Sequence, residues 1–125
     1  MLGLAAAILL PKPGQNVAHL WVVITEPDPA TGEVIIVNLT TQRPHSDTTV
    51  ILQAGDHPFI KHPTAVNFID ARIVILSLLE QAIATGTGAV HQIVEASVLK
   101  RIQDGLLRSS FTPNKIKAFF RARME

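Results

Sequence analysis

Residues 17–40 decide the fold, with VAHLWVVIT at 17–25, PDPATG at 27–32 and EVIIVNLT at 33–40. The first and last of these stretches are rich in β-branched residues, which favour β-strands. The middle stretch holds two prolines and a glycine, which interrupt regular structure and are typical of a loop. The sequence therefore predicts two buried strands that pair as an antiparallel hairpin.

Three further stretches predict the rest of a β-rich body. The apolar run at 2–10 is too short to span a membrane and predicts a buried first segment. TTVILQ at 48–53 has strand composition, and so has AVNFIDARIVIL at 65–76, where we expect a break near Asp70. Four or five strands at this close spacing, without helices between them, favour a compact antiparallel barrel.

The C-terminal part of the chain has helical patterns. Residues 77–84 predict a short helix, and Ser97 is a candidate N-cap for a helix that ends near Arg108. Thr112 is a candidate N-cap for a last helix with Pro113 at its first position, where proline is tolerated. We therefore expect two or three α-helices to follow the strands.

The chain is long enough for one hydrophobic core, so we expect a single domain over residues 1–125. A β-barrel body would occupy residues 1–76, and a helical extension at 77–125 would pack on it. The fold class is therefore mainly β with C-terminal helices. The absence of cysteine excludes a thiolate nucleophile and sulfur-ligated zinc, and it fits a reducing, cytoplasmic location.

Charge is divided unevenly along the chain. Residues 1–96 carry four basic and eight acidic side chains, whereas residues 97–125 carry seven basic and two acidic ones. A basic surface formed by the second segment would attract phosphate groups or an acidic protein. The alternative interpretation is a set of solvated helix faces.

The segment GDHPFIKH at 55–62 is the densest group of chemically active side chains. Its two histidines, His57 and His62, are candidates for acid–base catalysis, because histidine is the residue type whose ordinary pKa lies near neutrality. Together with Asp56 they form an alternative candidate, a metal site with nitrogen and oxygen ligands. A third interpretation is a structural turn, in which Asp56 accepts hydrogen bonds from backbone amides and the histidines pack or face solvent.

Three segments in a fixed order, VNLTTQ at 37–42, TTVIL at 48–52 and HPTAVNFIDARIV at 62–74, resemble the MazF/PemK/Kid family of toxins. The resemblance covers roughly residues 17–76. It implies a small SH3-like antiparallel barrel of four to six strands, closed by two or three α-helices, that forms a homodimer. It also implies cleavage of single-stranded RNA through the 2′-OH, with no cofactor and no metal.

The resemblance also places candidate site residues. Thr40 or Thr41 takes the position of the family's active-site hydroxyl residue. The family's first strand opens with an Arg-Pro pair, whose arginine stabilises phosphate charge, whereas this sequence has Ala18 and His19 there. A group that is charged only part of the time at neutral pH would then replace a permanent cation.

RNA cleavage without a metal needs a base for the 2′-OH proton, an acid for the leaving 5′-oxygen and donors for the phosphate oxygens. We assign the base to His57 or His62, the acid or phosphate donor to His19, and the oxyanion donor to Thr40. Further residues are expected to bind substrate: Thr41, Gln42, Asp56, Lys61 and Arg72.

The resemblance implies an enzyme, the endoribonuclease of a toxin–antitoxin system. Its partners would be single-stranded RNA, a second copy of the chain and an acidic antitoxin, whose charge would complement the basic C-terminal segment. No membrane partner is expected. The alternative function is a non-catalytic SH3-like barrel module that binds a protein or a nucleic acid.

Overall fold

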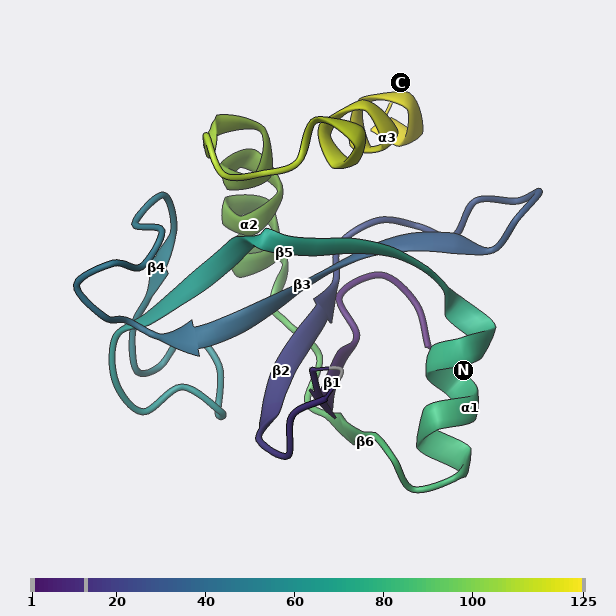
Figure 1. Cartoon of the computed structure of the whole chain (residues 1–125), viewed down its shortest axis with the longest axis horizontal. Coiled ribbons are helices and arrows are strands. Elements are labelled where there is room, and N and C mark those ends of the chain that lie inside the picture. The colour runs from purple at the N-terminus through teal and green to yellow at the C-terminus, as the bar shows by residue number, and fades with distance from the viewer. Residues whose placement is uncertain (1, 13, 125) are drawn as a thin grey trace.

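The computed structural model describes residues 2–12 and 14–124. Over these residues the strands are β1 (Ala7–Pro11), β2 (Ala18–Val23), β3 (Glu33–Thr41), β4 (Ile51–Leu52), β5 (Thr64–Ile75) and β6 (Ala89–His91). The helices are α1 (Leu76–Ala84), α2 (Ala96–Arg108) and α3 (Asn114–Met124). All the strands join one antiparallel sheet in the order β4-β5-β3-β2-β1-β6 (Figure 1). The fold is therefore mainly β, with helices after the long strands.

The predicted hairpin is β2–β3, with Leu20 opposite Leu39. β3 also pairs with β5 along most of its length. The register of that pair shifts between Ile36 and Asn38, where β5 carries extra residues around Asp70. The break predicted near Asp70 is therefore a bulge within one continuous strand.

Two strands differ from the sequence prediction. The strand predicted at 48–53 is reduced to Ile51–Leu52, because Asp47 Oδ1 accepts hydrogen bonds from the backbone N and the hydroxyl of Thr49 and holds those residues in a loop. β6 lies within the extension at 77–125, yet it pairs with β1 and belongs to the sheet. Its three residues are too few to give a strand pattern in the sequence.

The helix ends also differ from the prediction. α2 begins at Ala96, so Ser97 lies in its first turn, and no side chain caps the helix. The hydroxyl of Thr112 donates to the carbonyl oxygen of Leu106 at 2.7 Å, so it caps the end of α2 and not the start of α3. None of the helices in the described residues is long and apolar enough to cross a membrane.

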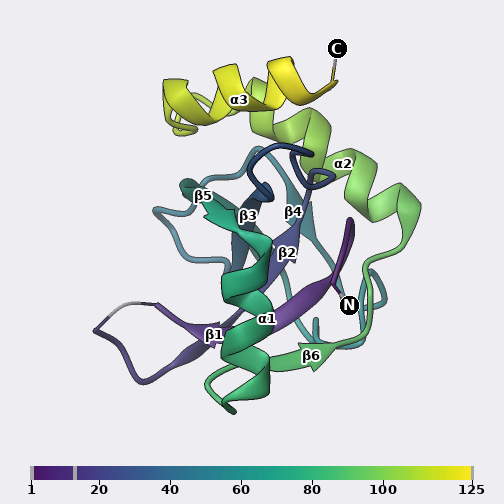
Figure 2. The ribbon, with the colours of Figure 1, turned by 90° about the vertical axis from the view of Figure 1, so that its right-hand side faces the viewer.

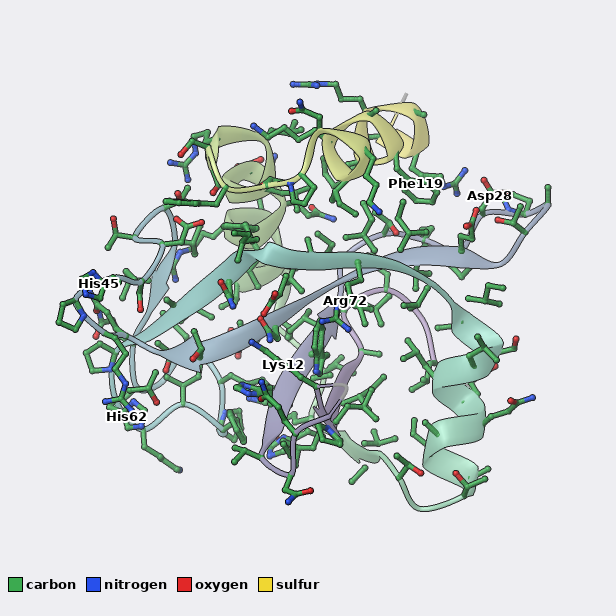
Figure 3. The ribbon with its side chains drawn as sticks, viewed as in Figure 1. Lys12, Asp28, His45, His62, Arg72 and Phe119 are labelled. Atoms are coloured by element: carbon green, nitrogen blue, oxygen red, sulfur yellow. The ribbon has the colours of Figure 1, made fainter. Side chains whose placement is uncertain are left out.

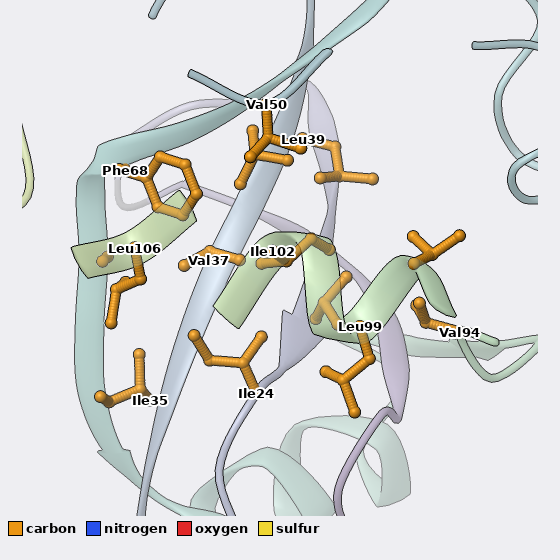
Figure 4. Packing of buried hydrophobic residues seen from close by; sticks show 14 of the residues in the cluster. Ile24, Ile35, Val37, Leu39, Val50, Phe68, Val94, Leu99, Ile102 and Leu106 are labelled. Carbon is orange, nitrogen blue, oxygen red and sulfur yellow. The ribbon is translucent and has the colours of Figure 1, made fainter. Parts of the chain in front are cut away.

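Helices cover both faces of the sheet, because its central strands carry apolar side chains on both sides. On one face, Val37 and Phe68 belong to a cluster that includes buried side chains of α2 and α3. Figure 4 shows them with Ile102 and Leu106 of α2. On the other face, Trp21 and Val23 pack with the apolar side of α1, which lies away from α2 and α3 (Figure 2). The sheet is thus fixed from both sides.

The approach of α2 to the sheet is closest at Gly105. A Cβ atom at this position would overlap the side chains of Val50 and Phe68, so only glycine fits without a shift. The close contact fixes the C-terminal end of α2, and with it the loop that follows.

The sheet is curled but open. β4 and β6 form its two edges, and no backbone pairing joins them within residues 2–12 and 14–124. The structure therefore contains a curled half-barrel of six strands and not a closed barrel (Figure 1).

Candidate functional site

Four of the predicted site residues line one hollow at the ends of three adjacent strands. Its volume is about 330 Å³, and its lining includes His19 of β2, Thr40 and Thr41 of β3, and His62 just before β5. Thr41 lies opposite Thr64 in the β3–β5 pair, so the antiparallel register brings these groups to one end of the sheet. We call this hollow the histidine–threonine pocket.

Both histidines of the pocket are oriented by backbone carbonyl groups. The Nδ1 atom of half-buried His19 lies 3.4 Å from the carbonyl oxygen of Leu39. The Nδ1 atom of exposed His62 lies 3.4 Å from the carbonyl oxygen of Pro63. A carbonyl oxygen can only accept a hydrogen bond, so both contacts favour a proton on Nδ1. Each imidazole then keeps Nε2 for proton transfer to or from a ligand.

Arg43 also lines the histidine–threonine pocket, although the sequence analysis did not select it. It follows β3 in a turn where its backbone N donates to the hydroxyl of Ser46 at 2.7 Å. Its guanidinium takes part in none of the ion pairs between described residues. The lining of the pocket therefore includes a residue that carries a permanent positive charge. One signal in the sequence could have indicated Arg43: it is a basic residue only two positions after Thr41.

His57 lies outside this pocket and is almost fully buried, at 4% exposure. Its Nε2 atom donates to the carbonyl oxygen of Gln92 at 2.6 Å, and its Nδ1 atom accepts from the backbone N of Phe59 at 3.0 Å. Its ring also packs against His91, with 5.0 Å between the ring centres. Because both nitrogens already have partners, we assign His57 a structural role and leave it out of the proposed catalytic set.

The 55–62 segment contains Asp56, His57 and His62, the candidate ligands of the metal interpretation. No group of three histidine, aspartate or glutamate side chains among them is placed to hold a metal ion. Asp56 Oδ2 instead accepts from the backbone N of Gln53 at 2.8 Å and lies 3.3 Å from the guanidinium of Arg101. Asp56 and His57 therefore form the structural turn that was the third interpretation.

The remaining predicted residues do not line the histidine–threonine pocket. Gln42 is exposed just after β3, and its backbone N donates to the carbonyl oxygen of Pro63 at 3.1 Å. Lys61 lines a separate hollow of about 440 Å³. The guanidinium carbon of Arg72 lies 5.2 Å from the centre of the Trp21 ring, near the middle of the sheet (Figure 3).

A polar group near the middle of the sheet was missed by sequence reasoning. Lys12 and Asp70 form an ion pair, and Asp70 also accepts from the side chain of Asn67 at 3.0 Å. Asn38, opposite Asn67, is fully buried, and neither polar atom of its side chain has a hydrogen-bond partner among the described residues. A buried polar group without a partner costs roughly 1–3 kcal/mol, so we expect the Asn38 amide to lower the stability of the fold.

Comparison with known proteins assigns no family. No protein-family model matches the chain, and no curated protein matches it. The function proposed below therefore rests on the geometry of the histidine–threonine pocket, on general chemistry and on the resemblance described above.

Proposed function

We propose that this chain is an endoribonuclease that cleaves single-stranded RNA through its 2′-OH without a metal ion. The observation that carries the proposal is that His19 of β2 and His62, just before β5, line one pocket together with Thr40, Thr41 and Arg43. Two titratable groups, hydroxyl donors and a permanent cation are what this reaction requires. The curled antiparallel sheet supports the further proposal that the fold derives from the SH3-like barrel of the MazF/PemK/Kid toxins.

In the proposed reaction, neutral His62 takes the proton of the 2′-OH, and the 2′-oxygen forms a bond to the adjacent phosphorus. The bond between phosphorus and the 5′-oxygen of the next nucleotide breaks. Protonated His19 gives its proton to that oxygen. The products are a 2′,3′-cyclic phosphate and a free 5′-OH, and proton exchange with water restores both imidazoles.

Arg43 and the threonine hydroxyls stabilise the charge that develops on the phosphate oxygens. The family's arginine belongs to the first strand, where this chain has His19. Arg43 instead follows β3, whose end lies at the same pocket. We infer that Arg43, after β3, takes the role that the arginine of the first strand has in the family. His19 is then available for proton transfer.

A second candidate function, a non-catalytic module that binds a partner, is favoured by the sheet edge at β6. Val90 in this strand and Ile93 just after it are 57% and 66% exposed. Aliphatic side chains at an unpaired edge strand are typical of protein contacts. The same exposed aliphatic side chains support a homodimer, in which a second copy of the chain covers this edge.

An acidic antitoxin is proposed as a partner of α3. Lys115 and Arg121 of this helix are exposed and take part in none of the ion pairs between described residues. Three other basic residues of the extension are paired, Lys100 with Asp104, Arg101 with Asp56 and Arg123 with Asp28. Arg108 of α2 and Lys117 of α3 take part in none of these ion pairs. The charge available to a partner is therefore concentrated on α3.

The proposal is tested by incubating the purified chain with a labelled pool of single-stranded RNA in EDTA. We expect fragments that end in a 2′,3′-cyclic phosphate, and no cleavage of the same sequences with 2′-O-methyl groups, which lack the nucleophile. Binding without cleavage, in EDTA and with added Mg²⁺, Mn²⁺ or Zn²⁺, would instead favour the binding module. If the chain neither binds nor cleaves RNA, the assignment to RNA is overturned.

A further inference from the structure

A second hollow adjoins the histidine–threonine pocket and shares Thr40 with it. Its volume is about 270 Å³. Its lining consists of Thr40, His45, Ser46, Asp47, Asn67, Ile69 and Phe111. His45 and His62, one from each hollow, lie at the same end of the sheet in Figure 3. We call the second hollow the Phe111 pocket. The two hollows therefore meet at Thr40.

Phe111 is held at this pocket by a chain of hydrogen bonds. Its backbone N donates to Ser109 Oγ at 3.1 Å, and Ser109 Oγ donates in turn to Asp47 Oδ2 at 2.6 Å. Both Ser109 and Asp47 are buried. Thr112, on the other side of Phe111, donates to the carbonyl oxygen of Leu106 at 2.7 Å. The loop that carries Phe111 is thus fixed at both ends.

The fixed loop leaves an apolar surface beside polar groups. Phe111 is 52% exposed and Ile69 is 58% exposed, although both line the Phe111 pocket. Another phenylalanine, Phe59, lines the histidine–threonine pocket and is 37% exposed. Each of the two hollows that share Thr40 therefore has a partly exposed phenylalanine in its lining. Exposed aromatic rings next to a backbone-binding site are the surfaces on which single-stranded nucleic acids stack their bases.

We propose that the Phe111 pocket binds a nucleobase of the RNA next to the phosphate that is cleaved. The proposal rests on the endoribonuclease function proposed above. Phe111 stacks on the face of the base, and Ser46 and Asn67 offer donors and acceptors to its edge. Phe111 lies outside residues 17–76, which carry the family resemblance. The helical extension therefore supplies part of the substrate site and does more than cover the core.

The test measures binding of a 2′-O-methyl RNA tetranucleotide, which cannot be cleaved, to the wild-type chain and to two variants. Loss of the ring in Phe111→Ala should weaken binding about fivefold to 150-fold, because stacking of one base contributes about 1–3 kcal/mol. Phe111→Trp keeps an aromatic face and should bind within about threefold of the wild type. Met124→Ala, at an exposed apolar residue of α3, is the matched control and should change nothing.

The outcomes separate this proposal from the proposed function. Equal binding by Phe111→Ala and the wild type overturns the base site, while cleavage by both proteins leaves the endoribonuclease standing. Weaker binding by Phe111→Ala without cleavage by the wild type supports the base site and overturns the endoribonuclease. Sedimentation of the same samples tests a protein contact. If Phe111→Ala changes the oligomeric state and leaves the RNA affinity unchanged, Phe111 belongs to a protein contact and the proposal is overturned. A wild-type chain that binds no RNA also overturns the proposal.

Discussion

Ser109 Oγ donates a 2.6 Å hydrogen bond to Asp47 Oδ2, and both side chains are buried. This bond joins the loop after α2 to the loop before β4. The other oxygen of Asp47, Oδ1, accepts from the backbone N and the hydroxyl of Thr49, at 2.9 Å and 2.6 Å. One carboxylate therefore organises the loop that borders both pockets and ties the helical extension to the sheet.

Asp47→Ala should lower the free energy of unfolding by roughly 1–3 kcal/mol, because buried donors lose their acceptor. Urea denaturation measures the change. Thr48→Ala, at the exposed neighbouring residue, is the control and should stay within about 0.5 kcal/mol of the wild type. A stability of Asp47→Ala equal to that of the control would show that the Ser109–Asp47 bond contributes nothing.

Asn38→Leu should raise the free energy of unfolding by about 1 kcal/mol, because it removes a fully buried amide that has no partner among the described residues. Thermal and urea denaturation report the difference. Asn38→Asp is the opposite change, because it places a charge at the same buried position, and it should destabilise the chain. A Leu variant that is less stable than the wild type would mean that the amide has a partner in solution.

His57→Ala should destabilise the chain by roughly 2–4 kcal/mol, because it leaves a cavity and removes the partners of Gln92 and Phe59. At a temperature where the variant is folded, its cleavage rate should stay within about threefold of the wild type, since its ring nitrogens serve the fold. Circular dichroism and the RNA assay measure the two effects. A His57→Ala chain that is fully folded but inactive would show that His57 takes part in catalysis.

Much of the fold follows from local patterns in the sequence. The β2–β3 hairpin was predicted because both strands are long and β-branched, and prolines mark the loop between them. β6 was missed because its pairing with β1 depends on residues about eighty positions away. The shortened β4 depends on the Asp47–Thr49 hydrogen bonds, which composition does not encode.

Part of the candidate site could be predicted from the sequence, because residues near the ends of adjacent antiparallel strands lie at the same end of the sheet. His19, Thr40 and His62 meet for that reason. His57 could not be separated from His62 in the sequence, because its partner Gln92 follows β6, which was itself missed. Phe111 reaches Thr40 only through the fold of the helical extension, so no spacing in the sequence connects the two.

The most direct test of the central claim is the single-turnover rate of RNA cleavage in EDTA by the wild type and by His19→Ala, His62→Ala and Arg43→Ala. We expect each variant to fold as the wild type does and to lose about a hundredfold or more in rate. This is the usual contribution of an acid–base group, here His19 or His62, and of a group that stabilises transition-state charge, here Arg43. Lys100→Ala, which removes an exposed lysine paired with Asp104, should cleave at the wild-type rate. Wild-type rates in all three pocket variants would contradict the account.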